Sequence, residues 1–88
     1  MPTLAYLRGI KVIMYYEDHD PPHFHARGAE FRAKFAIGDL SVLALQGRLK
    51  PRESALIRQW ALANRDALLQ NWLRARHGEP MAEIEGVN

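Results

Sequence analysis

The spacing of apolar residues changes at Pro51, and this change strongly limits what the chain can fold into. Before Pro51, apolar and polar residues alternate, most clearly over residues 31–37. Alternation with a period of two is typical of a strand that buries one face. After Pro51, apolar residues recur every three or four positions, as they do in a helix with one apolar face. The sequence therefore predicts an α+β fold in which strands come first and helices follow.

The first half predicts four strands that form a small antiparallel sheet. We expect these strands at residues 4–7, 10–16, 31–37 and 40–47. Arg8-Gly9 and Gly38-Asp39 are turn sequences, so neighbouring strands should pair as a meander. Residues 81–84 are expected to add a short fifth strand near the C-terminus.

The second half predicts helix from Pro51 to Arg76. Its apolar stripe is centred on Trp60 and Trp72, which we interpret as core anchors. An unbroken helix would be roughly 35–40 Å long at 1.5 Å per residue, more than a domain of this size can cover. We therefore expect a bend near residues 64–66, which gives either a helical hairpin or a kinked long helix packed against the sheet.

Polar residues on and after this stripe carry further structural predictions. Asn64 and Asn71 lie on the apolar stripe, where a buried amide needs hydrogen-bond partners. They should bond the histidine-rich segment or mark the bend. The sequence His77-Gly78, followed by Pro80, is typical of the end of a helix.

Length and composition limit the class of protein to which the chain can belong. The 88 residues predict one domain, residues 1–88. The absence of cysteine excludes a disulfide framework and a thiolate metal site, and it favours a reducing, cytoplasmic location. The N-terminal residues predict neither a signal peptide nor a membrane span, so no membrane contact is expected. Twelve basic and ten acidic side chains give a net charge of +2, which permits nucleic-acid binding without requiring it.

Residues 18–25 form the segment with the densest chemistry. They hold three of the four histidines, two aspartates and the Pro21-Pro22 pair. The prolines force an extended path, so His23 and His25, two positions apart, should lie on the same side of a strand-like segment. The segment therefore predicts a functional site at which two imidazoles converge.

One interpretation of this segment is a metal site. Imidazole is a common ligand of zinc and similar divalent ions. His23 and His25 would bind the ion with Asp20 as a third ligand, for which Asp18 and His19 are alternatives. A fourth position left open for water would make the site hydrolytic.

A second interpretation is metal-free cleavage of RNA. One histidine would take a proton and the other would donate one, while Asp18 and Asp20 raise their pKa and fix their tautomers. Arg27 or Lys11 would stabilise charge that develops on the phosphate. Arg32 and Lys34 beside Arg27 would help to hold RNA or DNA across the sheet.

A third interpretation is binding without catalysis. Tyr15, Tyr16, His19 and Phe24 would then recognise a partner protein or a base by stacking and hydrogen bonding. A purely structural role is the remaining alternative, in which the aspartates cap the turn and Phe24 fills the core. We favour that role for His19 alone. The exposed edges of a small sheet also predict a homodimer.

Short motifs along the chain resemble those of one known family. They lie at residues 13–16, 18–19, 21–26, 47–49, 60–61, 71–72 and 84–85. The chain resembles the uncharacterised bacterial family catalogued as domain of unknown function 4160. The resemblance implies an association with toxin–antitoxin pairs and a small partner protein from a neighbouring gene. Among the alternatives above, it favours a nucleic-acid-binding or RNA-cleaving protein.

Overall fold

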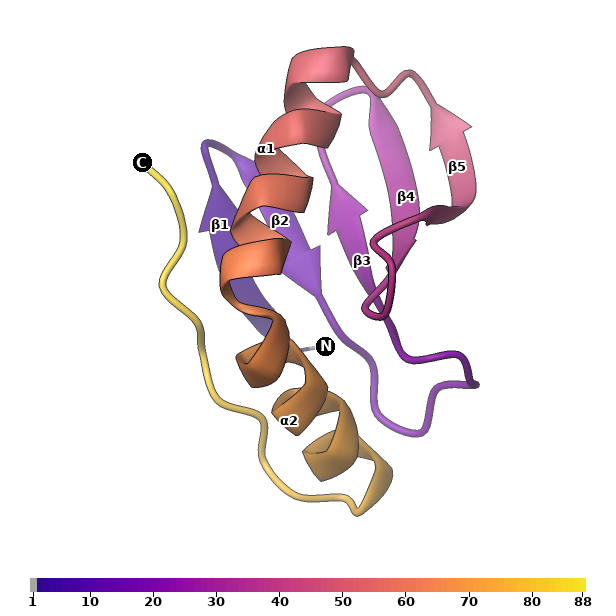
Figure 1. The fold of residues 1–88 in the computed structure, drawn as a ribbon, viewed down its shortest axis with the longest axis vertical. Coiled ribbons are helices and arrows are strands. Elements are labelled where there is room, and N and C mark those ends of the chain that lie inside the picture. The colour runs from indigo at the N-terminus through magenta and orange to yellow at the C-terminus, as the bar shows by residue number, and fades with distance from the viewer. Residues whose placement is uncertain (1) are drawn as a thin grey trace.

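The computed structural model describes residues 2–88, in which five strands form one antiparallel sheet. In chain order the strands are β1 (Thr3–Leu7), β2 (Ile10–Ile13), β3 (His23–Arg27), β4 (Phe31–Ala36) and β5 (Val42–Gly47). Each strand pairs with the next along the chain, so the sheet is a meander (Figure 1). The predicted α+β class and antiparallel meander are confirmed.

The sheet differs from the prediction at the histidine-rich segment. Its second half is itself a strand, β3, inserted between the predicted second and third strands. β2 ends at Ile13 instead of residue 16, because the chain leaves the sheet there for the loop that carries Pro21 and Pro22. The extended, strand-like path predicted for His23 and His25 is present, but the sequence did not place it in the sheet, since the prolines leave only Phe24 and Ala26 as alternating apolar residues.

Two helices follow the sheet, α1 (Pro51–Ala63) and α2 (Arg65–Arg76). The chain bends at Asn64, whose side-chain Nδ2 donates a hydrogen bond to the carbonyl oxygen of Trp60 at 2.8 Å. The predicted bend is confirmed, and α2 continues along the long axis of the molecule instead of folding back (Figure 1). The helical region is therefore a kinked helix and not a hairpin. It ends before Gly78, which has a φ of 69°, as the stop signals predict.

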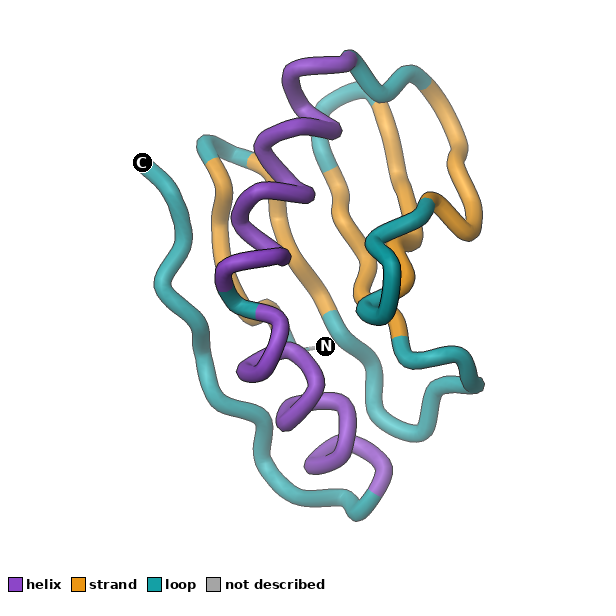
Figure 2. Tube along the Cα trace, viewed as in Figure 1, coloured by secondary structure: helices purple, strands orange, loops and turns teal. Residues whose placement is uncertain are grey.

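Both helices lie on one face of the sheet and close the core there (Figures 1 and 2). Phe24 of β3 stacks on Phe35 of β4 with ring centroids 5.6 Å apart, and it meets Trp60 of α1 edge-on at 6.3 Å. Ile57 and Leu68 are fully buried beside them. One core thus joins sheet and helices, and the opposite face of the sheet is left open.

The C-terminal segment runs beside β1 without forming the strand predicted at residues 81–84 (Figure 2). Its backbone hydrogen bonds are spaced irregularly: Ile84 donates to Leu4, and Val87 donates to Tyr6 and accepts from Arg8. A single parallel bridge joins Leu7 and Val87. The segment therefore covers the β1 edge, and β5 remains the open edge of the sheet.

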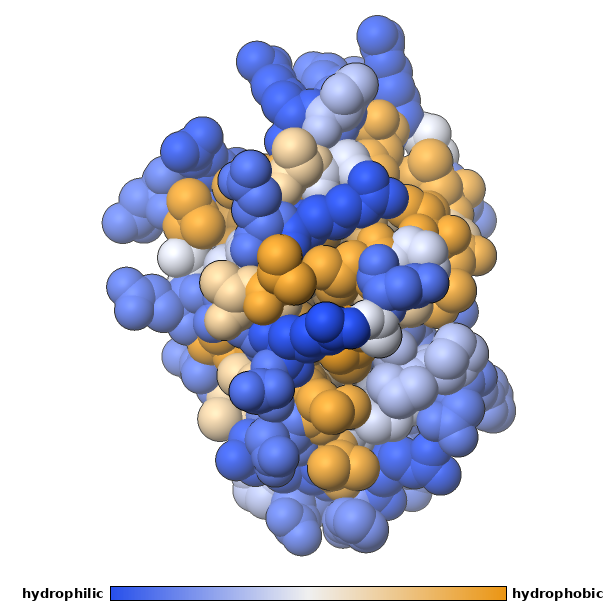
Figure 3. All heavy atoms as spheres, in the orientation of Figure 1, coloured by the Kyte–Doolittle hydropathy of each residue, from blue (hydrophilic) through white to orange (hydrophobic). Residues whose placement is uncertain are grey.

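Apolar side chains also reach the surface on the helix side of the molecule (Figure 3). The large exposed ones on the helices and β5 are Val42, Leu43, Leu45, Leu62, Leu69 and Leu73. In the described range 2–88, no helix combines the length and the hydrophobicity needed to cross a membrane.

Candidate functional site

Three side chains from the histidine-rich segment meet at the start of β3. His23 and His25 belong to β3, and Asp18 lies in the loop before it. The Oδ2 atom of Asp18 is 2.9 Å from Nε2 of His23 and 3.3 Å from Nε2 of His25. The two imidazole centroids are 5.1 Å apart. The structure thus brings both histidines to one carboxylate oxygen; we call these three residues the histidine cluster.

The backbone orients two members of the histidine cluster. The Nδ1 atom of His23 lies 2.8 Å from the carbonyl oxygen of Pro21. This contact turns the Nε2 edge of the ring towards Asp18. The Oδ1 atom of Asp18 accepts a hydrogen bond from the backbone N–H of His19 at 2.9 Å. Oδ2 is therefore the carboxylate oxygen left to face the histidines.

The surroundings set the charge of Asp18. Burial raises the pKa of Asp18, but the hydrogen bond from His19 and the two nearby imidazoles lower it. The net result is a pKa below the ordinary value for an aspartate. Asp18 is therefore ionised at neutral pH.

The surroundings also set the charge of His25. Burial lowers the pKa of His25, the hydrogen bond to Asp18 raises it, and the neighbouring His23 and Lys34 lower it again. The net pKa lies below the ordinary value for a histidine. At neutral pH, His25 is therefore mainly the neutral imidazole, in which one ring nitrogen carries a hydrogen and the other a lone pair.

The two histidines differ in their access to solvent. The side chain of His23 is 3% exposed and packs against Trp72 of α2, with ring centroids 5.2 Å apart. The side chain of His25 is 26% exposed and touches the Tyr15 ring edge-on at 4.7 Å. A dissolved molecule can therefore reach His25 but not His23.

The histidine cluster borders the open face of the sheet, which carries four cations. Lys11 of β2 lies opposite Arg27 of β3, and Arg27 lies opposite Arg32 of β4. In the next row, His25 lies opposite Lys34. Directly opposed residues of antiparallel strands point to the same face. The strand register therefore gathers Lys11, Arg27, Arg32 and Lys34 on one side of the sheet; we call these four residues the basic face.

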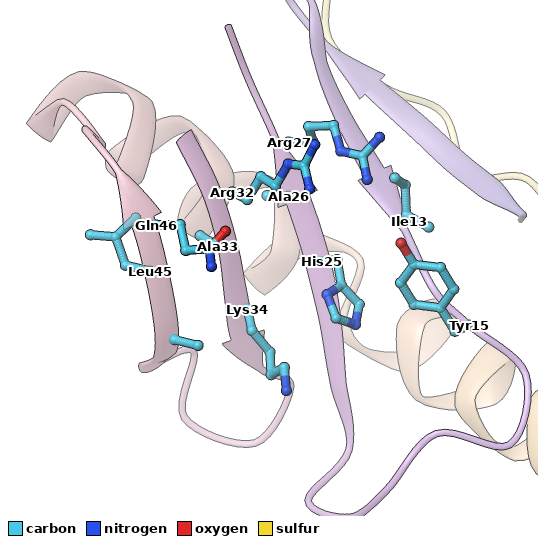
Figure 4. A pocket seen from close by; sticks show the side chains of 11 residues that line it. Ile13, Tyr15, His25, Ala26, Arg27, Arg32, Ala33, Lys34, Leu45 and Gln46 are labelled. Atoms are coloured by element: carbon cyan, nitrogen blue, oxygen red, sulfur yellow. The ribbon is translucent and has the colours of Figure 1, made fainter. Parts of the chain in front are cut away.

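The basic face contributes Arg27, Arg32 and Lys34 to a shallow hollow that His25 and Tyr15 also line (Figure 4). Within the described range 2–88, none of its four cations lies within 4.0 Å of a carboxylate. The ion pairs found there join other residues, Lys50 to Glu30 and Arg76 to Asp20, while the carboxylate of Asp18 is taken up by the two histidines. Neighbouring like charges across a sheet repel one another, so this surface favours a bound anion.

Two residues that belong with the basic face were missed by the sequence analysis. Tyr6 of β1 lies opposite Lys11, and Gln46 of β5 lies opposite Arg32. Tyr6 is 57% exposed between the buried Ala5 and Leu7. The signal was present, because a strand that alternates in burial must turn the residue between two buried neighbours outwards.

Two predicted site residues lie outside the site. The carboxylate of Asp20, predicted as the third metal ligand, points away from the histidines and forms an exposed ion pair with Arg76 at 2.9 Å. Asp18 takes its place in the histidine cluster. Phe24, predicted as an aromatic binding surface, is 0% exposed in the core and cannot contact a partner.

Two other predicted binding residues lie at the surface. Tyr16 is 44% exposed in the loop after β2. His19 is also exposed, and it contributes only its backbone N–H to the histidine cluster.

A family described as a domain of unknown function (DUF4160) matches residues 9–73. The chain belongs to this family. The range matched to DUF4160 contains the histidine cluster, the basic face and both tryptophans, and it ends before the segment that covers β1. No curated protein and no solved structure matches the chain.

The chemistry available to this DUF4160 member follows from the geometry. The four cations of the basic face are the kind of side chain that pairs with anionic groups such as phosphate. The histidine cluster offers two imidazoles and one carboxylate around one point, next to that face. Only one of its imidazoles can exchange protons with a bound molecule.

Proposed function

We propose that this protein binds RNA and holds the phosphate backbone against the basic face. The observation that carries this proposal is the strand register, which places four unpaired cations of three strands on one open surface. Phosphate contacts supply most of the affinity of a nucleic-acid-binding protein. The toxin–antitoxin association stays a prediction of the family resemblance, as do a small partner protein and a homodimer.

The shape of the face favours single-stranded RNA. An open sheet presents a broad surface on which unpaired bases can stack against aromatic rings. Tyr6 lies in the same cross-strand row as Lys11, and Tyr15 lines the hollow beside His25. A strand laid across the sheet would therefore meet cations for its phosphates and rings for its bases.

The position of the histidine cluster bears on RNA cleavage. His25 opens onto the same hollow as Arg27, Arg32 and Lys34, so a bound phosphodiester would lie within its reach. His23 is buried, so the cluster lacks the second accessible proton-transfer group that metal-free cleavage by two histidines needs. We therefore propose RNA binding as the function. RNA cleavage would require a further catalytic group at the histidine cluster, beside His25.

The test is RNA binding measured by fluorescence anisotropy with a labelled single-stranded RNA over a range of salt concentrations. Arg32→Ala and Arg27→Ala should each lower the slope of log K against log salt by about 0.7, which is about fivefold in affinity at 0.1 M salt. Arg52→Ala is the matched control, because Arg52 is an exposed arginine at the start of α1. Its removal changes the net charge equally but leaves the basic face intact.

Two results would contradict the proposal. One is an absence of RNA binding at low salt. The other is an equal effect of Arg52→Ala and Arg32→Ala, which would mean that net charge alone, and not the basic face, attracts RNA.

A further inference from the structure

We propose that Asp18, His23 and His25 bind a divalent metal ion of the zinc type. One potential ligand atom from each residue lies within 4.8 Å of the other two. Zinc binds imidazole nitrogen and carboxylate oxygen at about 2.0–2.2 Å, which puts neighbouring tetrahedral ligands about 3.3–3.6 Å apart. The Oδ2 atom of Asp18 is 3.3 Å from Nε2 of His25, which lies in this range, and 2.9 Å from Nε2 of His23, which is shorter, so the carboxylate has to move slightly away from His23 when the ion binds.

The hydrogen bonding of His23 is an independent reason for a cation at this point. A carbonyl oxygen can only accept a hydrogen bond, so the Nδ1 of His23 must carry the hydrogen in its contact with Pro21. In a neutral ring, Nε2 then carries a lone pair, and it faces the carboxylate oxygen of Asp18 at 2.9 Å. Two acceptors then face each other at a partly buried position, where the side chain of His23 is 3% and that of Asp18 is 20% exposed. A metal ion bound by both atoms satisfies both, and the alternative is an extra proton on His23.

The surroundings match those of metal ligands in three respects. A metal-binding histidine usually donates its other ring N–H to a carbonyl or a carboxylate, as His23 does to Pro21. Asp18 is held by the backbone N–H of His19 through the oxygen that faces away from the histidines. Packing against Trp72 and Tyr15 restrains the two imidazoles.

The ligand set leaves a coordination position for an exogenous ligand. Three protein ligands with a fourth position open are typical of a catalytic zinc site. The cluster opens on the side of the partly exposed His25, which lines the hollow of the basic face (Figure 4). On the proposed function, a phosphate oxygen of bound RNA or a water molecule beside it is the ligand expected there. This last step rests on the proposed function, whereas metal binding itself does not.

The first experiment is zinc titration of untagged protein against a chromophoric chelator. We expect one zinc ion per chain, with the affinity lowered by more than about 100-fold in His25→Ala and in Asp18→Asn, since even changes behind the ligands cost 10–100-fold. His19→Ala is the matched control, because His19 lies in the same segment with an exposed side chain outside the cluster. It should bind zinc like the unmodified chain.

A second measurement keeps the proposal testable if a variant fails to fold. Imidazole nitrogen signals of the unmodified protein should shift at His23 and His25 when zinc is added, while those of His19 and His77 stay in place. An absence of zinc binding, or a doubly protonated His23 that zinc leaves unchanged, would overturn the proposal.

The zinc and RNA proposals fail separately. Arg32→Ala should leave zinc affinity unchanged, because Arg32 is outside the cluster. If zinc binds but RNA does not, the metal site stands and the proposed function falls. If RNA binds and zinc does not, the proposed function stands and the metal site falls.

Discussion

At the scale of single residues, buried polar groups depend on partners that are far away in the sequence. Asn71 is 0% exposed on α2. Its side chain donates to the carbonyl oxygen of Ala82 and accepts from the N–H of Ala82, both at 2.8 Å. The sequence indicated that this amide needs partners, but it suggested the histidine-rich segment or the bend. The partner is Ala82 in the C-terminal segment, because the chain reverses direction after α2 and runs back beside it.

We predict that Asn71→Ala lowers the free energy of unfolding by about 2–4 kcal/mol, because it leaves a cavity and removes the partners of Ala82. Asn64→Ala is the matched control. Asn64 is partly exposed and makes one side-chain bond, to Trp60, so its loss should cost only about 0.5–1.5 kcal/mol. Urea unfolding followed by circular dichroism gives both values. Equal losses would mean that Asn71 does not hold the C-terminal segment.

The same scale explains why the sequence pointed to the wrong carboxylate for the cluster. Asp18 and Asp20 both flank His19, and spacing alone treats them alike. The structure separates them, because the loop turns Asp20 outwards to Arg76 and turns Asp18 inwards to His23. Arg76 is distant in sequence, so no local pattern could have revealed its pairing.

At the scale of elements, the sequence predicted the strands and helices whose apolar residues form a run or a repeating pattern, and it left out of the sheet the strand that follows the two prolines. β4 has a long alternation, and both tryptophans repeat at helical spacing, so β4 and the helical region were found. The isolated apolar pair of β3 was not. The pattern of a single strand could not predict the basic face, because this face depends on how β2, β3 and β4 align. Arg27, Arg32 and Lys34 were predicted to lie near one another, but the register brings Lys11 into the same row.

One turn between elements has an unusually strict requirement. Gly47 ends β5 with a φ of 85°, and a Cβ atom there would collide with the carbonyl oxygen of Glu30. That oxygen accepts the N–H of Arg48 at 2.7 Å as the chain turns towards α1. Only glycine can combine the left-handed backbone with this close approach.

We predict that Gly47→Ala lowers the free energy of unfolding by about 2–4 kcal/mol. The control is Gly38→Ala in the turn before β5, where an added Cβ would meet no atom within 4 Å. Its effect should stay within about 0.5 kcal/mol. Thermal and urea unfolding of the two variants gives the comparison, and a Gly47→Ala protein as stable as Gly38→Ala would contradict the strain argument.

At the scale of the whole molecule, the family match and the folding unit do not coincide. The match ends at residue 73, yet the segment beyond it covers the β1 edge and supplies partners to the core. The Nε1–H of Trp60 donates to the carbonyl oxygen of Glu85 at 2.8 Å. Met81, Ile84 and Val87 pack against the core. The C-terminal segment is therefore part of the fold.

We predict that a chain truncated after Gly78 is largely unfolded or aggregates. It loses the bonds of Ala82, Ile84, Glu85 and Val87, at about 1 kcal/mol each, against a total stability of about 5–15 kcal/mol. It also exposes a second sheet edge. Glu83→Ala in the full chain is the control, because it changes an exposed side chain of the same segment and keeps the backbone bonds. Size-exclusion chromatography and circular dichroism would test this, and a monomeric, folded truncated chain would contradict it.

The open face of the sheet has a consequence for how such a protein can change over time. Its strands turn alternate residues to opposite sides, so the side chains that meet a ligand are not those that fill the core. A new pattern of charges or rings on β2, β3 and β4 therefore leaves the packing beneath the helices untouched. Ligand preference can drift by single exposed substitutions without loss of the fold. The same independence makes the sheet a suitable scaffold for the design of surfaces that recognise anionic molecules.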